Sequence, residues 1–181
     1  MSGTLSRLMR VDTRPRFARA LGIMDANAPW IVGDGNIALT SGTVRYSYIP
    51  LLAGDVVTNV HCWVDVVSGT VTTIKGGLYS ISGTTATRLG SSANITTAFD
   101  AIGLATFPLS SPYTVPTTGN YLIAIISVAT SPGSLLAHAP GGVTGKGTGA
   151  VVAGGVEAGQ TDLDVSATIA VSSVCLWAGW S

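Results

Sequence analysis

The side chains that most often carry acid–base and nucleophilic chemistry are scarce in this sequence. Histidine occurs only at His61 and His138, and the one glutamate is Glu157. General acid–base catalysis needs a positioned acid and base, and covalent catalysis adds an activated nucleophile. Because the sequence offers so few of these groups, we expect that the protein is not an enzyme.

The sequence also argues against a metal site. His61 follows the polar face of an expected strand beside Cys62, which is more typical of a surface or interface histidine than of a metal ligand. Asp162 and Asp164 share a strand face and could hold a cation weakly, but solvated charges next to turns are the simpler interpretation. We expect no metal.

Residues 140–147 invite comparison with a phosphate-binding loop. The first glycine of that motif is replaced by Pro140, and the serine or threonine that would hold magnesium is replaced by Gly147. These two departures argue against nucleotide binding. We therefore expect no cofactor.

Exposed aromatic side chains offer a different chemistry, because many jelly rolls bind glycans. The candidates for contact with a glycan or with a protein interface are Tyr46, Tyr48, Trp63, Tyr79 and Trp180. Trp63 alternates with the apolar side chains of its strand and so falls on the more polar face. A covered or intersubunit tryptophan is the simpler interpretation there, because interfaces are enriched in aromatic residues.

The positive charge of the chain is concentrated at its N-terminus. Five arginines lie within the first nineteen residues, namely Arg7, Arg10, Arg14, Arg16 and Arg19. With Asp12, residues 1–20 carry +4 (five minus one), and residues 21–181 carry four cations and eight acids, or −4. Guanidinium groups pair with carboxylates in fork geometry and are costly to bury alone. We expect residues 1–35 to be an attachment arm, with Trp30 as an apolar anchor.

The composition describes one weakly charged domain. The chain has 181 residues, of which only 10% are charged against a usual value of about a quarter, and 23 are glycine. Few surface charges give little protection against association, so we expect an assembly. No apolar run reaches the roughly 18 to 20 residues of a membrane helix, and the N-terminus lacks a secretory signal. Synthesis in the cytoplasm is expected, which favours free, buried thiols for Cys62 and Cys175.

From about residue 36 the apolar residues alternate with a period of two, with turn-forming residues every 8 to 12 positions. This pattern predicts an antiparallel sandwich or barrel. We expect a strand at 56–66 with its even-numbered valines inward, and a strand over 103–109 that ends near Pro108. The apolar run 121–128 is predicted to be a central strand covered on both faces. Residues 139–160 are expected to form a Gly-rich loop.

The last segment, residues 165–177, alternates again. We expect Val165, Ala167, Ile169 and Val171 to point inward. The alternation slips at Ser172-Ser173, which predicts a bulge in one long terminal strand.

Three groups of residues carry a resemblance to a known family. They are Leu52-Ala53-Gly54-Asp55, Gly77-Leu78-Tyr79, and Tyr113-Thr114-Val115-Pro116 followed by Gly119-Asn120-Tyr121. Over roughly residues 40–130 the chain resembles a β-rich module of virion proteins of tailed bacteriophages, mainly phages of actinobacteria. The resemblance implies an all-β, antiparallel, jelly-roll-like β-sandwich and a place in a virion. Similar modules occur in minor tail proteins, fibres and head-associated proteins.

These observations lead to two hypotheses for a chain with an arm at 1–35 and a sandwich domain at 36–181. The first is a structural protein of a tailed phage, a head-associated decoration or minor capsid protein, which docks on the major capsid protein or another virion protein. We expect a homo-oligomer, with a trimer favoured. The alternative is a minor tail or fibre protein that attaches to a host glycan. Nucleic acid is a weaker candidate, because five arginines on a body of opposite sign make a small electrostatic footprint.

Overall fold

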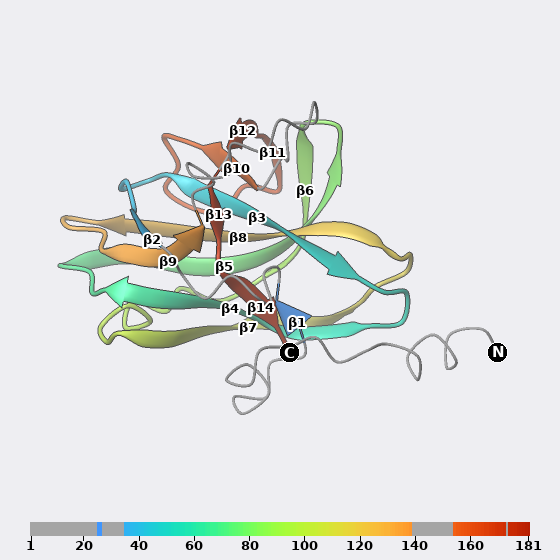
Figure 1. Ribbon diagram of the computed structural model, residues 1–181, viewed down its shortest axis with the longest axis horizontal. Helices are drawn as coiled ribbons and strands as arrows, with labels where there is room; N and C mark the ends of the chain where they lie inside the picture. Colours follow the sequence, from blue (N-terminus) through green and yellow to red (C-terminus); the bar gives the residue numbers. More distant parts are fainter. Residues whose placement is uncertain (1–24, 27–34, 139–153, 173) are drawn as a thin grey trace.

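The chain folds into two packed β-sheets (Figure 1), and the described residues contain no helix. The computed structural model describes residues 25–26, 35–138, 154–172 and 174–181. The arginine-rich stretch 1–24 and Trp30 lie outside the described residues. The expected all-β fold is confirmed.

Fourteen strands are assigned within the described residues. They are β1 (Asp25–Ala26), β2 (Gly35–Ala38), β3 (Val44–Leu51), β4 (Val56–Val66), β5 (Val71–Ser82), β6 (Thr85–Ser91), β7 (Gly103–Thr114), β8 (Gly119–Ala129), β9 (Ser134–His138), β10 (Gly154–Glu157), β11 (Ser166–Thr168), β12 (Ala170–Ser172), β13 (Cys175–Leu176) and β14 (Ala178–Trp180). Sheet A consists of β1, β2, β4, β7, β9, β13 and β14. Sheet B consists of β3, β5, β6, β8, β10, β11 and β12.

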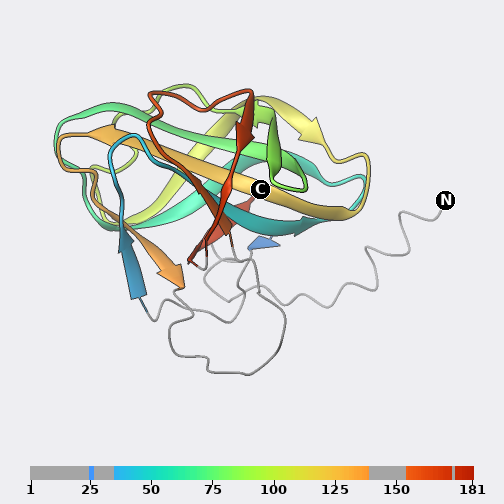
Figure 2. The same cartoon turned by 90° about the horizontal axis from the view of Figure 1, so that it is seen from above.

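Eight consecutive strands, β2 to β9, have the connectivity of a jelly roll. In sheet A they lie in the order β2-β9-β4-β7, and in sheet B in the order β3-β8-β5-β6, with every pair antiparallel. Figure 2 shows β2 in blue and β9 in orange side by side, although almost 100 residues separate them in the chain. These two interlocked orders are those of a double Greek key. The jelly-roll-like sandwich expected from the resemblance is confirmed.

Strand β8 is the centre of sheet B and is buried on both faces, as the apolar run predicted. Tyr121, Ile123 and Ile125 point into the core between the two sheets. Leu122 and Ala124 belong to a second apolar cluster on the outer face of sheet B. Because both faces of β8 are apolar, a third layer of chain has to cover sheet B.

Strand β4 differs from the expected alternation at its ends. Its register with β7 shifts between Val57 and Asn59, so Val57 is fully buried while Val56 is 45% exposed. Val66 is also half-exposed, at 50%, beside a second register shift against β9. The expectation that Val56 and Val66 point inward was wrong, because a bulge exchanges the two faces of a strand.

Strand β7 does not end at Pro108 but continues to Thr114. In sheet A it pairs only with β4, with Thr114 opposite Val56, and its other edge forms a single bridge, between Leu109 and Ser92, so β7 is an edge strand of this sheet. Proline lacks the N–H that a neighbouring strand would need, and edge strands tolerate this loss. Pro108 and Pro112 are therefore compatible with a strand of 12 residues.

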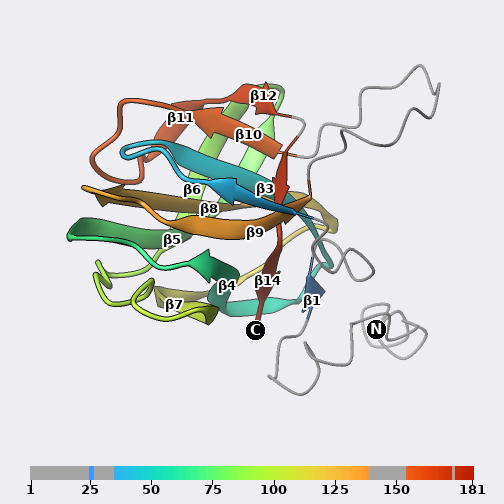
Figure 3. The same ribbon diagram turned by 60° about the vertical axis from the view of Figure 1, so that its left-hand side comes forward.

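The terminal segment is not one bent strand but four short ones that change sheet. β11 and β12 belong to sheet B, whereas β13 pairs with β9 and β14 pairs with β4, both in sheet A. Figure 3 shows β10 and β12 above β3, and β14 below it. The slip in alternation at Ser172 marks this crossing, and Val165, which was expected to point inward, is 64% exposed.

The outer face of sheet B is covered by residues 158–169, here called the covering segment, which include the edge strand β11, and two glycines make room for this segment. A Cβ on Gly77 would lie 2.9 Å from Leu163, and a Cβ on Gly155 would lie 2.8 Å from Ile169. Gly154 and Gly155, expected in a loop, belong to β10, where a Cβ on Gly154 would lie 2.2 Å from the Tyr46 carbonyl. Here glycine serves close packing and not a turn.

A Gly76→Ala substitution tests how tightly the two sheets pack. A Cβ on Gly76 would lie 2.7 Å from Phe107 and 2.8 Å from Val60, both on sheet A. We expect the free energy of unfolding to fall by about 1–3 kcal/mol, as in other overpacked cores. Gly119→Ala is the matched control, because nothing lies within 4 Å of a Cβ there. Urea unfolding that gives equal effects for both variants would contradict this packing.

Candidate functional site

The outer face of sheet A carries an apolar cluster around two tryptophans. Trp63 on β4 pairs in register with Leu104 on β7, and its ring meets that of Trp177 edge to face at 6.4 Å. Leu136 on β9 completes the cluster. Trp63, Leu104 and Leu136 remain partly exposed, whereas Trp177 is 3% exposed. We call these four residues the tryptophan patch.

The structure separates the aromatic candidates into two groups. Tyr46, Tyr79 and Trp180 are buried within the chain, with 1%, 0% and 2% of their surface exposed. Their rings cannot stack on a sugar, which corrects the expectation for these three. Tyr48 and Trp63 are partly exposed, but Tyr48 lies at the second apolar cluster of sheet B and Trp63 on sheet A. No shared aromatic platform results among the described residues.

Trp177 is the site residue that the sequence analysis missed. Its neighbours Leu176 and Ala178 enter the main core, so Trp177 must point to the opposite face of sheet A. The sequence shows this alternation, but only if β13 and β14 are assigned to the same sheet as Trp63. No local pattern in the sequence shows that β13 and β14 belong to sheet A.

Charged side chains are divided between the two sheets. Within the described strands, sheet B holds Arg45, Lys75 and Arg88, whereas sheet A holds no lysine or arginine and has Asp25 and Asp65. The described strands of sheet A therefore carry net negative charge. This is the sign that a basic arm would bind.

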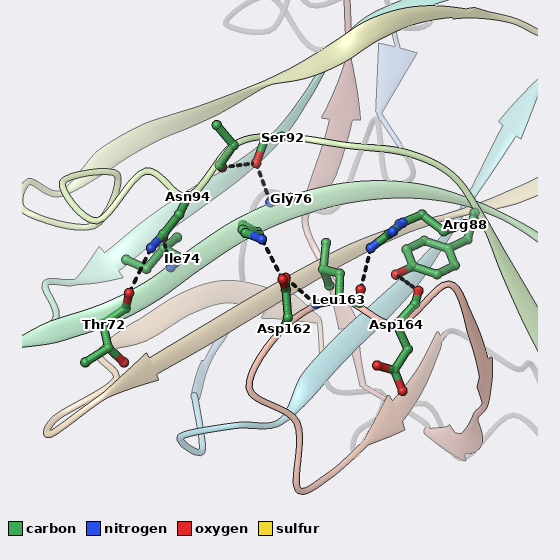
Figure 4. Close-up of polar contacts among 12 residues, drawn as sticks. Thr72, Ile74, Gly76, Arg88, Ser92, Asn94, Asp162, Leu163 and Asp164 are labelled. Atoms are coloured by element: carbon green, nitrogen blue, oxygen red, sulfur yellow. Dashed lines mark hydrogen bonds and ion pairs between the residues drawn. The ribbon is translucent and has the colours of Figure 1, made fainter.

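Two of the three cations of sheet B hold the covering segment in place (Figure 4). The ammonium group of Lys75 lies 2.6 Å from a carboxylate oxygen of Asp162. Arg88 donates a hydrogen bond to the carbonyl of Leu163, and the Tyr79 hydroxyl donates one to the carbonyl of Asp164 at 2.7 Å. Lys75 and Arg88 therefore make their polar contacts within the chain.

The surroundings shift the pKa of Asp162, in the covering segment, and the pKa of Glu157, at the end of β10, in opposite directions. Partial burial tends to raise the pKa of Asp162, but hydrogen bonds from Lys75 and the Leu163 N–H hold that pKa below its usual range. Burial raises the pKa of Glu157, and the charge of Asp164 adds to this, although a hydrogen bond from Tyr46 opposes it. The weak cation site considered for Asp162 and Asp164 is thus replaced, at Asp162, by an ion pair with Lys75.

Arg45, the third cation, is half-buried on the inner side of β3. Burial lowers the pKa of its guanidinium group, and its Nε atom has no hydrogen-bond partner. Two of the three described cations are thus bound by the chain, and the third is partly removed from solvent. Sheet B therefore offers little positive charge to the surroundings.

His61 was expected at the surface or in an interface, but it is buried within the chain, with 4% of its surface exposed. Its Nδ1 lies 3.1 Å from the Thr106 hydroxyl, and its Nε2 lies 3.0 Å from the Ser181 hydroxyl. Burial lowers the pKa of His61 to about 4, so the ring is neutral at pH 7. The carbonyl oxygen of Ser181 also accepts hydrogen bonds from the backbone N–H groups of Thr58 and Asn59 at the bulge in β4. His61 therefore positions the end of β14.

Cys62, on the same strand, faces the opposite side. Its free thiol is completely buried in the main core, and burial raises its pKa above the usual range. A buried thiol with a raised pKa is a poor nucleophile. The expectation of a free, buried thiol is confirmed for Cys62, whereas the Cys175 side chain lies outside the described set.

Asn94 completes the open edge of β5 (Figure 4). Its side-chain oxygen accepts a hydrogen bond from the Ile74 N–H at 2.8 Å, and its side-chain nitrogen donates one to the Thr72 carbonyl at 2.8 Å. Ser92 accepts a hydrogen bond from the Gly76 N–H in the same way. Asn94 belongs to an Asn-Xaa-Thr pattern, and here its amide takes the place of a neighbouring strand.

The described residues contain no group of three or more histidine, cysteine, aspartate or glutamate side chains that could hold a metal ion. They also form no helix long and apolar enough to span a membrane. What the described residues do bring together is an apolar patch and negative charge on one sheet. That combination suits a protein-binding surface.

The chain was compared with protein-family models, with curated proteins and with solved structures, and none of the three comparisons found a match.

Two substitutions separate packing from charge in the covering segment. Leu163 is 3% exposed, so Leu163→Ala should lower the free energy of unfolding by about 2–4 kcal/mol. The Lys75–Asp162 pair is partly exposed, so Lys75→Met should change it by less than about 1 kcal/mol. Both values follow from chemical unfolding at pH 7. A larger effect for Lys75→Met than for Leu163→Ala would show that charge, not packing, holds the segment.

The buried ring of His61 makes stability depend on pH. Its pKa is about 4 in the folded chain against 6.5 for the free side chain, so the unfolded chain takes up the proton first. The contribution is fully present above pH 6.5 and is lost as pH falls through 4, by about 3 kcal/mol. His61→Gln cannot take up this proton. Unfolding measured from pH 7 to pH 4 should therefore show the two proteins converging, and a constant difference would contradict the assignment.

Proposed function

We propose that the chain is a structural protein of a tailed-phage virion. The proposed role is that of a head-associated decoration or minor capsid protein, held in the particle by its basic N-terminal arm. Its partner would be the major capsid protein or another virion protein, and it would act as a homo-oligomer. The observation that carries this proposal is the division of charge between residues 1–20 and sheet A.

The charge division supports attachment through the arm. Residues 1–20 carry +4, and the described strands of sheet A carry only the acids Asp25 and Asp65. An arginine-rich segment next to such a body is poorly suited to packing in its own core, since guanidinium groups are costly to bury unpaired. It is well suited to contacts with carboxylates on a neighbouring protein.

The position of β1 supports the same role. Asp25 pairs with Trp180 and Ala26 with Gly179, so part of the expected arm 1–35, shortly after its arginine-rich residues, joins sheet A. The tryptophan patch lies on the outer face of this same sheet.

The fold is the last support. A jelly roll gives a rigid, closed core with little charge, which suits repeated contacts in a shell. The residues of the resemblance, such as Gly54 and Asp55, build this fold. Fold alone does not decide function, so the charge division remains the main argument.

A second candidate is a minor tail or fibre protein that binds a host glycan. Tyr48 and Trp63 favour it, because both rings are partly exposed. They lie on different sheets, however, so each would have to act in a separate site. Cryo-electron microscopy of the particle separates the two candidates, since density on the shell supports the first and density confined to the tail supports the second.

Removal of residues 1–20 tests the role of the arm. We expect the shortened chain to keep its β fold by circular dichroism, because all described strands remain, and to be absent from purified particles. Mass spectrometry of particles from a host that supplies the variant measures the occupancy.

The matched control keeps the full length and changes the five arginines to lysine, which retains the charge but loses the fork geometry. This control should give intermediate occupancy. Normal occupancy of the shortened chain would overturn the proposed attachment.

A further inference from the structure

Exposed apolar side chains gather at one end of the sandwich. Val66, Val67 and Ile102 are 50%, 42% and 69% exposed. Val64 on β4 pairs with Gly103, the first residue of β7. Val66 and Val67 come just after Val64, and Ile102 comes just before Gly103, so all three lie close to this pair in the chain. The Ser68 N–H donates to the Phe99 carbonyl at 3.1 Å and holds the two connections together.

The same end carries acids without a neighbouring cation in sheet A. Asp65 precedes Val66, and one of its carboxylate oxygens accepts a hydrogen bond from Asn36 at 2.5 Å. Asp100 is exposed two residues before Ile102. We call Asp65, Val66, Val67, Asp100 and Ile102 the distal end.

The distal end is continuous with the tryptophan patch. Trp63 and Leu104 form a cross-strand pair on the outer face of sheet A, one residue beyond the pair of Val64 and Gly103. A partner that covers Ile102 therefore meets further apolar surface along β4 and β7. Exposed apolar surface rimmed by charge is typical of an interaction site.

Strand β1 runs along sheet A toward the distal end. β14 runs antiparallel to β4, and β1 runs antiparallel to β14, so β1 runs parallel to β4. Asp25 lies at the level of Trp180 and Val60, before Ala26, so the chain enters β1 from the end of the sheet that carries Val56. The distal end lies at the opposite end of β4, roughly 20 Å away at about 3.3 Å per residue.

We propose that the distal end of one copy binds residues 1–20 of a second copy of this chain. Those residues supply both kinds of side chain that the distal end needs, the apolar Leu5, Leu8 and Met9 and the five arginines. The apolar side chains cover Val66, Val67 and Ile102, and the arginines pair with Asp65 and Asp100. The inference rests on the proposed structural role and takes the other virion protein that the arm binds to be a second copy of this chain.

The arm and the distal end are different parts of the chain, so a contact between them joins unlike parts of two copies. Such a contact is heterologous, so it closes into a ring if the rotation between copies permits and otherwise continues as an open chain. An isologous dimer would need one patch that matches itself, and an acidic end does not match another acidic end. A closed ring of few copies fits the proposed role in a shell.

Self-association of the purified full-length chain tests the proposal, measured by sedimentation velocity at low salt. Ile102→Lys should weaken association at least tenfold, because it places a cation against the arm. Val165→Lys is the matched control, since Val165 is equally exposed at 64% but lies beside sheet B. It should change association by less than twofold. Equal effects of the two variants, or a wild-type chain that stays monomeric at high concentration, would overturn the proposal.

Mixing two full-length variants shows whether the arm acts between copies. An arm variant with all five arginines changed to serine keeps its distal end, and Ile102→Lys keeps its arm. Each variant alone should be monomeric, and an equimolar mixture should form a one-to-one dimer that dissociates as salt rises from 0.05 to 0.5 M. A mixture that stays monomeric while the wild type assembles would overturn exchange between copies. Because no particle is involved, these results are independent of where the protein sits in a virion.

Discussion

Sheet B is apolar on both faces, and most of the structure follows from this constraint. The inner side chains of β8 are covered by sheet A, and its outer side chains need a second cover, which residues 158–169 provide. A polar outer face would need only water, as in many antiparallel sheets. Here the chain must return over the sheet. The glycines at positions 77 and 155 leave the space in which Leu163 and Ile169 pack.

This second cover also engages charged side chains of sheet B. Lys75 and Arg88 hold the covering segment, so the positive side chains of sheet B are engaged within the chain. The described strands of sheet A have no cation to offset Asp25 and Asp65. Two of the three cations in the described strands thus contact the covering segment of the chain itself, while sheet A keeps its acids without a cation of its own.

The sequence predicted the parts of the fold that local patterns determine. Alternation over 56–66 predicted β4, because a strand with one buried face has apolar residues at every second position. The apolar run 121–128 predicted the central strand β8, because a strand buried on both faces is apolar throughout. The patterns did not reveal the bulge at Val57, the continuation of β7 through Pro108, or the crossing after Ser172. Each of these depends on which strand lies alongside, and pairing between distant segments leaves no local signature. The burial of His61 and Trp180 escaped prediction for the same reason.

Only some of the aromatic residues that the sequence suggested for an interface lie at the candidate surface. Aromatic residues were expected to mark an interface, and Trp63 does lie at a partly exposed apolar patch. Tyr46, in contrast, is buried, and its hydroxyl group donates a hydrogen bond to Glu157. What the sequence could not show is that β4 and β7 bring Ile102 beside Val66, since 36 positions separate these residues. The register of β4 with β7 thus creates the distal end, a surface that no local pattern in the sequence reveals. Because this surface carries acids and residues 1–20 carry arginines, the proposed contact between copies joins two unlike surfaces, which makes it heterologous whatever path the arm takes.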